Sequence, residues 1–232
     1  MNIILSFSPT NQSYHIAQYF AKQLSWDIYD ITSHINQSKF DYQKEYQYVI
    51  ITFPVYSQSI PLPLIKVLKN IKGKYFILIA TYGKMGTGDV LYDARRLIKG
   101  EIIGAAYIPS RHSYKDNHEF TEFDKLETLL RRINTTTAIN IPKRKRHMLA
   151  KVFPNLRSRL NVRLKVNNKC IKCNHCNSIC PTNAINNGRI NNKCIRCLRC
   201  YYECPIKGLD VKYALPLRMY LKKDKLNQLI IY

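Results

Sequence analysis

The chain has 232 residues, of which 46% are hydrophobic, so one large domain or two small ones can bury a core. No apolar run approaches the roughly 18–20 residues of a membrane span, and Met1 to Pro9 lacks the basic leader and cleavage site of a signal peptide. We therefore expect a cytoplasmic protein without a transmembrane segment. The net charge of +22 is uneven, because residues 143–232 carry 21 of the 37 Lys and Arg residues but three of the 15 acidic ones, and also all eight cysteines. A boundary between two units is expected near residue 142.

Residues 1–140 alternate apolar runs with helical patterns. The candidate strands are Asn2–Phe7, Trp26–Ile31, Gln47–Phe53, Lys74–Thr81 and Glu101–Ile108. The candidate helices are Ser13–Leu24, Leu62–Ile71, Gly88–Lys99 and Glu122–Ala138. Alternating strands and helices predict a doubly wound α/β fold with a parallel sheet. Five strands in about 140 residues indicate a flavodoxin-like five-stranded sheet.

A hydroxyl-rich turn lies between the first predicted strand and the first predicted helix. Backbone N–H groups and the helix dipole at such a place favour phosphate. The turn resembles the S/T-x-T-G-N-S/T turn that holds the FMN phosphate in flavodoxins, at Ser8, Thr10 and Ser13. Asn11 replaces the glycine, whose left-handed conformation Asn can adopt, and Gln12 replaces the asparagine. The alternative is an ordinary helix capped by Ser or Thr.

Three further segments follow predicted strands, at the edge where such folds bind ligands. The ends of the third and fourth strands each offer a tyrosine suited to packing on an isoalloxazine ring, with ordinary surface packing as the alternative. The candidate flavin contacts here are Pro54, Val55, Tyr56, Tyr82 and Gly83. Arg111–Tyr114 follows the fifth strand and is expected to be an ordinary loop, with contact to a substrate or the flavin edge as the alternative.

Residues 142–166 form a basic stretch with a rough apolar stripe. We expect a linker whose apolar face packs between domains. The alternatives are binding to nucleic acid or to an acidic membrane surface, and electrostatic steering of acidic electron-transfer partners. The tail, residues 213–232, is expected to pack back on the body of the protein.

The eight cysteines form two copies of C-x2-C-x2-C-x3-C-P, from Cys170 to Pro181 and from Cys194 to Pro205, and so make an internal repeat. Three cysteines on a tight loop reach three corners of one metal–sulfide cube, while the x3 step carries the fourth away from it. Structural zinc sites pair two C-x2-C arms across a longer spacer, and disulfides belong to exported proteins, so the spacing favours iron–sulfur clusters over both. His175 lies outside the ligand register and is expected to be a loop side chain.

Residues 167–212 closely resemble bacterial two-cluster 4Fe-4S ferredoxins, which are small α+β domains. In that family the fourth cysteine of each motif binds the other cluster. The resemblance implies one cluster held by Cys170, Cys173, Cys176 and Cys204, and a second held by Cys194, Cys197, Cys200 and Cys180. Positive charge near the clusters favours their reduced form and raises the reduction potential. The basic side chains expected to do so are Lys172, Lys193, Arg196 and Arg199.

With "FPVY", "TYG" and the cysteine motifs, nearly the whole chain resembles flavodoxin–ferredoxin fusion proteins found mainly in anaerobic prokaryotes. The resemblance implies FMN in a domain at 1–141, a basic linker at 142–166, a ferredoxin domain at 167–212 and a tail at 213–232. The expected function is electron transfer between FMN, two 4Fe-4S clusters and an acidic redox partner protein. Reduction of a substrate at the flavin, which would make the protein an enzyme, is open. The alternatives are a nucleic-acid-binding protein with structural clusters and a ferredoxin with a cofactor-free docking domain.

Overall fold

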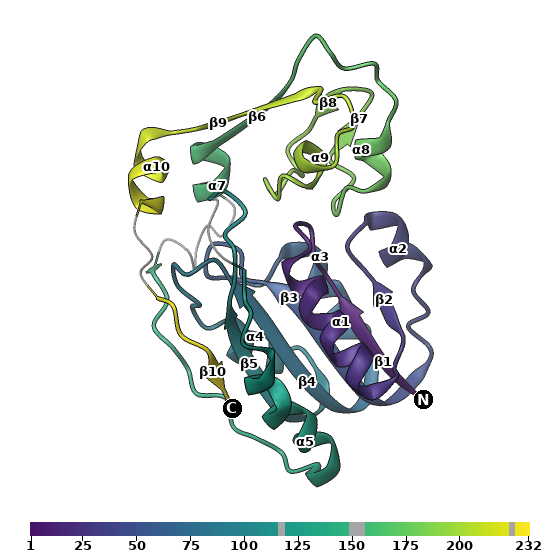
Figure 1. Cartoon of the computed structure of the whole chain (residues 1–232). Helices are drawn as coiled ribbons and strands as arrows, with labels where there is room; N and C mark the ends of the chain where they lie inside the picture. Colours follow the sequence, from purple (N-terminus) through teal and green to yellow (C-terminus); the bar gives the residue numbers. More distant parts are fainter. Residues whose placement is uncertain (116–118, 149–155, 223–225) are drawn as a thin grey trace.

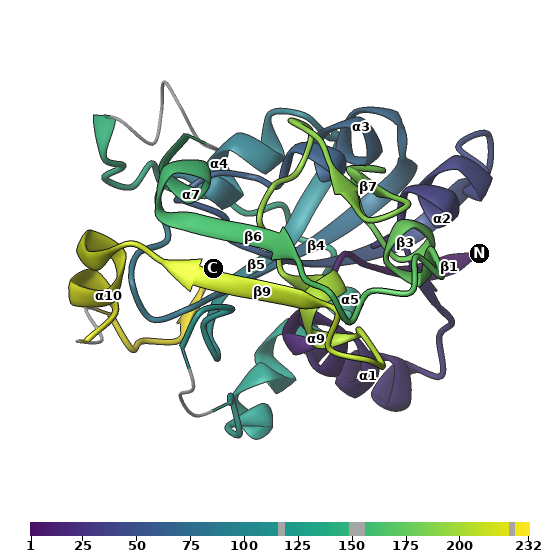
Figure 2. The ribbon, with the colours of Figure 1, turned by 90° about the horizontal axis from the view of Figure 1, so that it is seen from above.

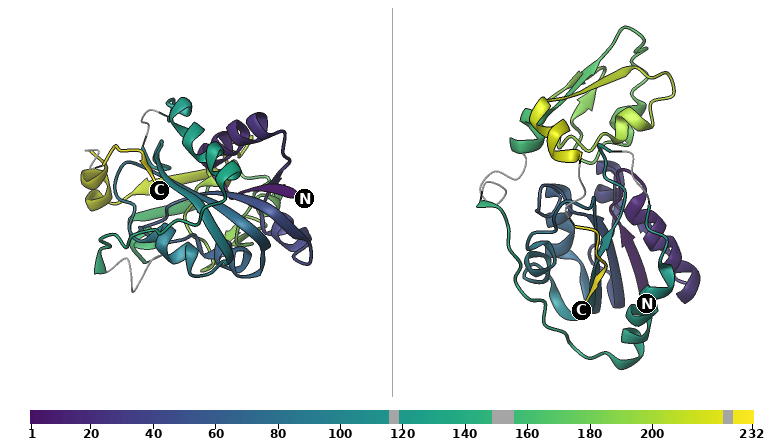
Figure 3. Two further views of the ribbon diagram at one scale, coloured as in Figure 1. Left: turned by 90° about the horizontal axis from the view of Figure 1, so that it is seen from below. Right: turned by 60° about the vertical axis from the view of Figure 1, so that its left-hand side comes forward.

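The computed structural model describes residues 1–115, 119–148, 156–222 and 226–232. An α/β domain forms the lower part of the molecule in Figure 1, and the cysteine-rich module lies above one edge of its sheet. Both ends of the chain lie at the opposite edge, as the right-hand view of Figure 3 also shows.

The sheet has the strand order β10-β5-β4-β3-β1-β2. Its parallel strands are β1 (Asn2–Ser6), β2 (Ile28–Asp30), β3 (Glu45–Pro54), β4 (Lys72–Tyr82) and β5 (Lys99–Pro109). These five follow the flavodoxin-like order 2-1-3-4-5. The expected count of five strands is corrected to six, because β10 (Ile230–Ile231) pairs antiparallel with β5. A two-residue strand has no periodicity to detect, and it covers the edge of β5.

Helices cover both faces of this sheet, which explains the continuous apolar runs of the central strands. One face packs against α1 (Gln12–Leu24), the 3-10 helix η1 (Phe123–Leu126) and α5 (Glu127–Thr135). The other packs against α3 (Leu62–Asn70) and α4 (Val90–Arg95). The helices expected at 88–99 and 122–138 are shorter in the structure. A further helix, α2 (His34–Lys39), begins where Ser33 Oγ accepts a hydrogen bond from the Asn36 N–H at 3.1 Å.

The module is built on two small antiparallel ribbons. Its strands are β6 (Val162–Val166), β7 (Ile185–Asn186), β8 (Arg189–Ile190) and β9 (Leu209–Tyr213), and Figure 2 shows β6 and β9 side by side. Its helices are α7 (Leu156–Asn161), α8 (His175–Ser178), α9 (Arg199–Tyr202) and α10 (Leu215–Leu221). Thus β6, inside the range expected to be linker, pairs along its full length with β9, and α10 lies in the range expected to be tail.

The cysteine repeat is also a repeat of backbone conformation. Non-glycine residues with positive φ are uncommon, yet here they recur at equivalent positions of the two repeats. The pairs are Lys172 and Arg196, Asn174 and Leu198, and Asn183 and Lys207. The helices α8 and α9 start at equivalent positions as well. The two motifs therefore have the same local backbone conformation.

The basic stretch before the module contacts the α/β domain where the structure describes it; residues 149–155 of the expected linker lie outside the described part. Arg146 Nη1 lies 2.6 Å from Asp93 Oδ2, and the Arg144 N–H donates to Asp89 Oδ1 at 2.6 Å. The side chain of Arg146 is thus paired with an acidic residue of α4, and the backbone of Arg144 is bound to Asp89, the residue before that helix. Among the described residues, no helix is long and apolar enough to cross a membrane.

Candidate cluster sites and an adjoining pocket

The first cavity of the module is lined by Cys170, Cys173, Cys176 and Cys204. Three of these come from the first motif, and Cys204 comes from the second. The Gly208 N–H donates to Cys204 Sγ at 3.1 Å. A Cβ at Gly208 would lie 3.1 Å from the Cα of Cys170, so the absence of a side chain lets the two segments approach each other.

The second cavity is lined by Cys180, Cys194, Cys197 and Cys200. Here three cysteines come from the second motif, and Cys180 comes from the first. The Ala184 N–H donates to Cys180 Sγ at 3.2 Å, which is the contact that Gly208 makes at the equivalent position of the other repeat. The structure thus brings together the two sets of four cysteines that the ferredoxin resemblance implies, with the fourth cysteines exchanged.

The chemistry of these sites fits a cluster rather than a single ion. A 4Fe-4S cube takes each thiolate on a different iron, so its ligands stand apart around a cavity, as the four thiols of each set do here. Burial raises the pKa of the Cys197 thiol to about 12 and also raises the pKa of Cys200. Bound iron would supply the positive charge that keeps such thiols deprotonated.

The two cavities differ in their surroundings. Cys173 of the first set is exposed, whereas Cys180 and Cys197 of the second are buried. Lys172 and His175, which line the first cavity, are exposed, whereas Arg199, which lines the second, and Arg196 are half-buried. Lys193 is an exception, because it precedes Cys194 of the second set and is exposed. Arg199 Nε donates to Glu203 Oε1 at 2.8 Å.

The second cavity adjoins the α/β domain through α2. The His34 N–H donates to the Cys180 carbonyl at 2.9 Å, and His34 Nδ1 lies 2.9 Å from the same oxygen. Gln37 Nε2 donates to the Pro181 carbonyl at 3.4 Å. Arg199 Nη2 lies 3.9 Å from Asp30 Oδ2 at the end of β2. These contacts hold Cys180, which the first motif contributes to the second set, against the α/β domain.

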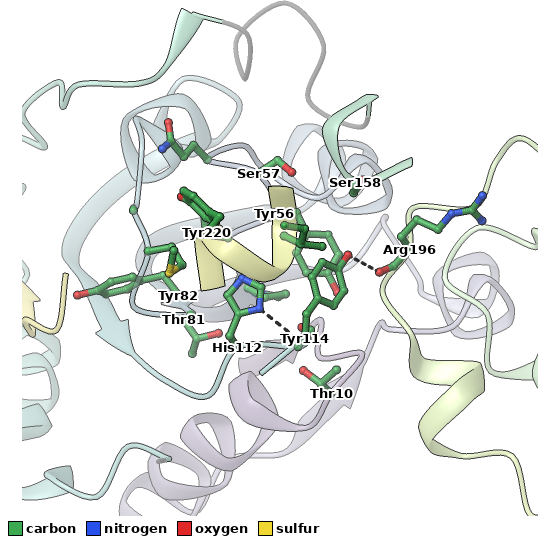
Figure 4. A pocket seen from close by; sticks show the side chains of 18 of the residues that line it. Thr10, Tyr56, Ser57, Thr81, Tyr82, His112, Tyr114, Ser158, Arg196 and Tyr220 are labelled. Carbon is green, nitrogen blue, oxygen red and sulfur yellow. Dashed lines mark hydrogen bonds between the residues drawn. The ribbon is translucent and has the colours of Figure 1, made fainter. Parts of the chain in front are cut away.

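A cavity of about 400 Å³ lies between the carboxyl ends of the parallel strands and the module, as Figure 4 shows from close by. Its volume is within the range of small-molecule sites. Of the ten predicted flavin contacts, seven line it: Thr10, Gln12, Pro54, Val55, Tyr56, Tyr82 and Gly83. Ser8, Asn11 and Ser13 are not among its lining residues.

The turn before α1 has the backbone conformation expected of a glycine at Asn11, whose φ is 63°. Two of its hydroxyls bind within the protein instead of facing the cavity. Ser8 Oγ accepts from the Tyr14 N–H at 3.0 Å, and Ser13 Oγ shares a 2.7 Å hydrogen bond with Thr81 Oγ1. Phosphate at this turn would therefore rely on Thr10 and on the first-turn N–H groups of α1 other than that of Tyr14, which Ser8 already binds.

Gln12 connects the turn before α1 to the segment that follows β5. Its Nε2 donates to Glu119 Oε1 at 3.0 Å, and its Oε1 accepts from Ser110 Oγ at 2.7 Å. Glu119 also lies 4.0 Å from Arg111, which lines the cavity. Arg111 and Arg196 line the cavity, whereas Glu119 is not among its lining residues.

Tyr56 stands in a tight two-residue turn. It forms a pair of backbone hydrogen bonds with Ser59, at 3.0 and 2.8 Å, while Ser57 and Gln58 have positive φ values of 49° and 62°. Gly88 supports this turn, because a Cβ there would lie 2.6 Å from the Gln58 carbonyl oxygen. Burial, followed by the nearby Cys197, raises the pKa of Tyr56 well above its usual value, so its hydroxyl keeps its proton and is a donor.

Tyr82 is bound to the tail. Its hydroxyl donates to the Gln228 carbonyl at 2.6 Å and accepts from the Gln228 N–H at 2.9 Å. The Leu226 N–H donates to the Lys84 carbonyl at 2.9 Å. The tail is thereby fixed along the α/β domain, next to the cavity.

The wall opposite the strands comes from segments that sequence reasoning missed. These lining residues are Ser158, Asn161, Ile195, Arg196, Pro216, Leu217 and Tyr220. No local pattern marks them, because they reach the cavity only through the placement of the module. Arg111 to Tyr114 also line it, which favours the alternative of a functional loop at this rim. The Tyr114 hydroxyl donates to the Arg196 carbonyl at 2.6 Å and so joins the two walls (Figure 4).

A comparison with known families supports this assignment of the module. A family model described as a 4Fe-4S binding domain matches residues 165–186, which contain the first cysteine motif. No curated protein and no solved structure matched the chain. The chain therefore contains a 4Fe-4S binding domain, which supports iron–sulfur electron transfer, and its α/β domain fits a flavodoxin-like fold.

Proposed function

We propose that this protein transfers electrons between FMN and two 4Fe-4S clusters, and between the clusters and a redox partner protein. The observation that carries the proposal is a shared wall. Ile195, which lies between two cysteines of the second motif, lines both the second cysteine cavity and the 400 Å³ cavity of the α/β domain. A flavin in the larger cavity would stand beside a cluster in the smaller one.

Each cavity supplies the groups its cofactor needs. Four thiols around each cysteine cavity match the four ligands of a 4Fe-4S cluster. In the larger cavity, Tyr82 and Tyr56 offer aromatic surface to an isoalloxazine ring, and Thr10 lies at the N-terminus of α1, where phosphate is favoured. Flavin exchanges two electrons or one, and each cluster exchanges one, so the pair converts two-electron events into single steps.

The partner is an acidic protein in this proposal. The first cysteine cavity lies at the surface, with Cys173 exposed. Exposed Lys172 lines it, and exposed Lys169 and Lys207 are next in sequence to the lining residues Cys170 and Gly208. Positive charge around an exposed redox centre speeds encounter with a negatively charged partner, most strongly at low ionic strength.

Anaerobic purification followed by iron, sulfide and flavin analysis tests the proposal. Two clusters require about eight irons and eight sulfides per chain, and we expect about one FMN beside them. Zinc in place of iron contradicts the cluster assignment. A full iron content without flavin, even after incubation with FMN, contradicts the flavin assignment and favours a cofactor-free docking domain.

A further inference from the structure

Buried hydrogen-bond donors without an acceptor collect at one place in the molecule. Among the described residues, the buried side-chain N and O atoms that lack a partner are Tyr56 Oη, Arg146 Nε, Arg196 Nε, Arg196 Nη1 and Arg199 Nη1. Arg196 and Arg199 flank Cys197 in the sequence. Tyr56 comes from the other domain and packs against the cluster of side chains that contains Ile195 and Cys197. Of these three side chains, Arg199 lines the second cysteine cavity, whereas Tyr56 and Arg196 line the larger cavity that shares Ile195 with it. The charge of Cys197 acts on the Tyr56 hydroxyl, so that hydroxyl lies near one of the cluster thiols.

The four atoms of Tyr56, Arg196 and Arg199 are all donors, and two of the three side chains carry positive charge. Buried donors normally have an acceptor in the protein or in ordered water, and buried charge is normally paired. Arg199 is already paired with Glu203 and lies near Asp30, so the donors without an acceptor are its Nη1, two nitrogens of Arg196 and the Tyr56 hydroxyl. A bound anion would supply the acceptors that the described residues do not provide. Four thiolates on a +2 core make a 4Fe-4S cluster a dianion with several sulfur acceptors, and Cys180, Cys194, Cys197 and Cys200 line the cavity where it would lie.

The first cysteine cavity has no comparable buried donors among the described residues that line it. The repeat places Lys172 where the second motif has Arg196, and His175 where it has Arg199. Both side chains are exposed, so water screens their charge. Within the described part of the chain, no buried donor without a partner belongs to the residues that line the first cavity. The two repeats thus share a backbone path and differ in the donors they offer.

We propose that the cluster held by Cys180, Cys194, Cys197 and Cys200 has the higher reduction potential of the two, and that Tyr56 raises it by donating a hydrogen bond to a cluster sulfur. Hydrogen bonds to the sulfurs and nearby positive charge stabilise the reduced, more negative cluster. This inference rests on the proposed cluster assignment, but not on flavin binding. It assigns Tyr56 a role across the domain interface, beside Tyr114 (Figure 4). The first electron to enter the clusters would then reside next to the flavin cavity.

The test is an anaerobic redox titration of the full-length, iron-loaded protein, followed by EPR spectroscopy. The variant is Tyr56→Phe, which removes only the hydroxyl. The matched control is Tyr82→Phe, because Tyr82 lines the same cavity but directs its hydroxyl to Gln228. We expect two separate midpoint potentials in the wild type. Tyr56→Phe should lower the higher one and leave the lower one in place, and Tyr82→Phe should leave both in place.

Iron analysis of each sample separates this inference from the proposed function. A low iron content in the wild type overturns the cluster assignment itself. With full iron, three results overturn the role of Tyr56: unchanged potentials in Tyr56→Phe, an equal fall of both, or the same fall in Tyr82→Phe. If Tyr56→Phe fails to fold, the titration of the wild type still shows whether the two clusters differ in midpoint potential. Arg196→Gln then shows which cluster has the higher one, because it should lower that potential. A single midpoint shared by both clusters contradicts the proposal.

Discussion

The two cysteine cavities are built by the same sequence pattern and the same backbone path, but they stand in different places. The first lies at the surface, where Ile171 is 71% exposed and Cys173 is open to solvent. The second is covered by the α/β domain through His34, Gln37 and the wall of the larger cavity. The repeat determines how thiols can surround a cluster. The neighbouring domain determines the charge, hydrogen bonding and water that the cluster meets.

This difference suggests a direction within the molecule. Under the proposed function, a cluster in the second cavity would exchange electrons with a flavin in the larger cavity, and a cluster in the first would exchange them with a partner. Matched substitutions at equivalent positions of the two repeats can therefore show whether the neighbouring α/β domain changes the properties of the second cavity.

The largest expected effect comes from removing one cysteine of each cavity. Cys197→Ala should abolish the second cluster and weaken FMN binding at least about tenfold, which equals about 1.4 kcal/mol, because Ile195 and Arg196 of the same loop form the cavity wall. Cys173→Ala should abolish the first cluster and leave FMN binding nearly unchanged. FMN fluorescence titration under anaerobic conditions measures both. Equal losses of affinity would show that the second loop has no special contact with the flavin.

A second comparison uses the repeat-related pair Gly208 and Ala184. In Gly208→Ala the new Cβ lies 3.1 Å from the Cα and 3.3 Å from the Cβ of Cys170. Overpacking of this kind costs about 1–3 kcal/mol, and we expect it to reduce the iron content of the first cavity only. Iron analysis and chemical denaturation of the loaded protein measure the effect.

The matched change Ala184→Gly removes a buried methyl group beside the second cavity. It should reduce stability without displacing Cys180, whose Sγ accepts from the backbone N–H at this position. Iron loss from both cavities in Gly208→Ala would mean that the two sites form as one unit rather than separately.

The sequence was a good guide where the signal is local. Long apolar strands with intervening helices predicted the parallel sheet, because strands buried on both faces have a continuous apolar pattern. The order of its five parallel strands is the one that the flavodoxin-like expectation carries. The cysteine spacing predicted that three thiols of each motif would face one cube, and the resemblance to two-cluster ferredoxins implied the exchange of Cys180 and Cys204 that the cavity linings show. Asn11, at the place of the glycine in the flavodoxin turn, does adopt the left-handed conformation that an asparagine allows.

Features that depend on contacts between distant segments were not predicted. Strand β10 has two residues and forms only because the edge of β5 is available to it. The hydroxyl of Ser13 was expected at a phosphate, but it reaches Thr81 of β4 instead. Ile195 and Tyr220 line the larger cavity only after the module is placed above the sheet, and no pattern in either half of the chain encodes that placement.

A smaller effect is expected from charge changes at equivalent positions of the two repeats. Arg196→Gln removes a half-buried guanidinium with two partnerless nitrogens, whereas Lys172→Gln removes an exposed ammonium. Both should lower the potential of their own cluster, and the shift should be clearly larger for Arg196, because water and salt screen the exposed charge. Redox titrations at low and high ionic strength measure the difference. Potential shifts of equal size in the two variants would show that burial of the charged side chain does not determine its effect on the cluster.

The smallest effect concerns the contact of α2 with the second repeat. His34→Ala removes the 2.9 Å side-chain contact with the Cys180 carbonyl but keeps the backbone N–H that donates to the same oxygen. One hydrogen bond of this kind contributes about 0.5–1.5 kcal/mol, and we expect a loss of that size in urea denaturation of the loaded protein. Gln37→Ala should cost less, because its hydrogen bond to Pro181 is 3.4 Å long. Because the first repeat has no described hydrogen bond from α2, a fall in the potential of its cluster in His34→Ala would contradict the idea that α2 acts on the second repeat alone.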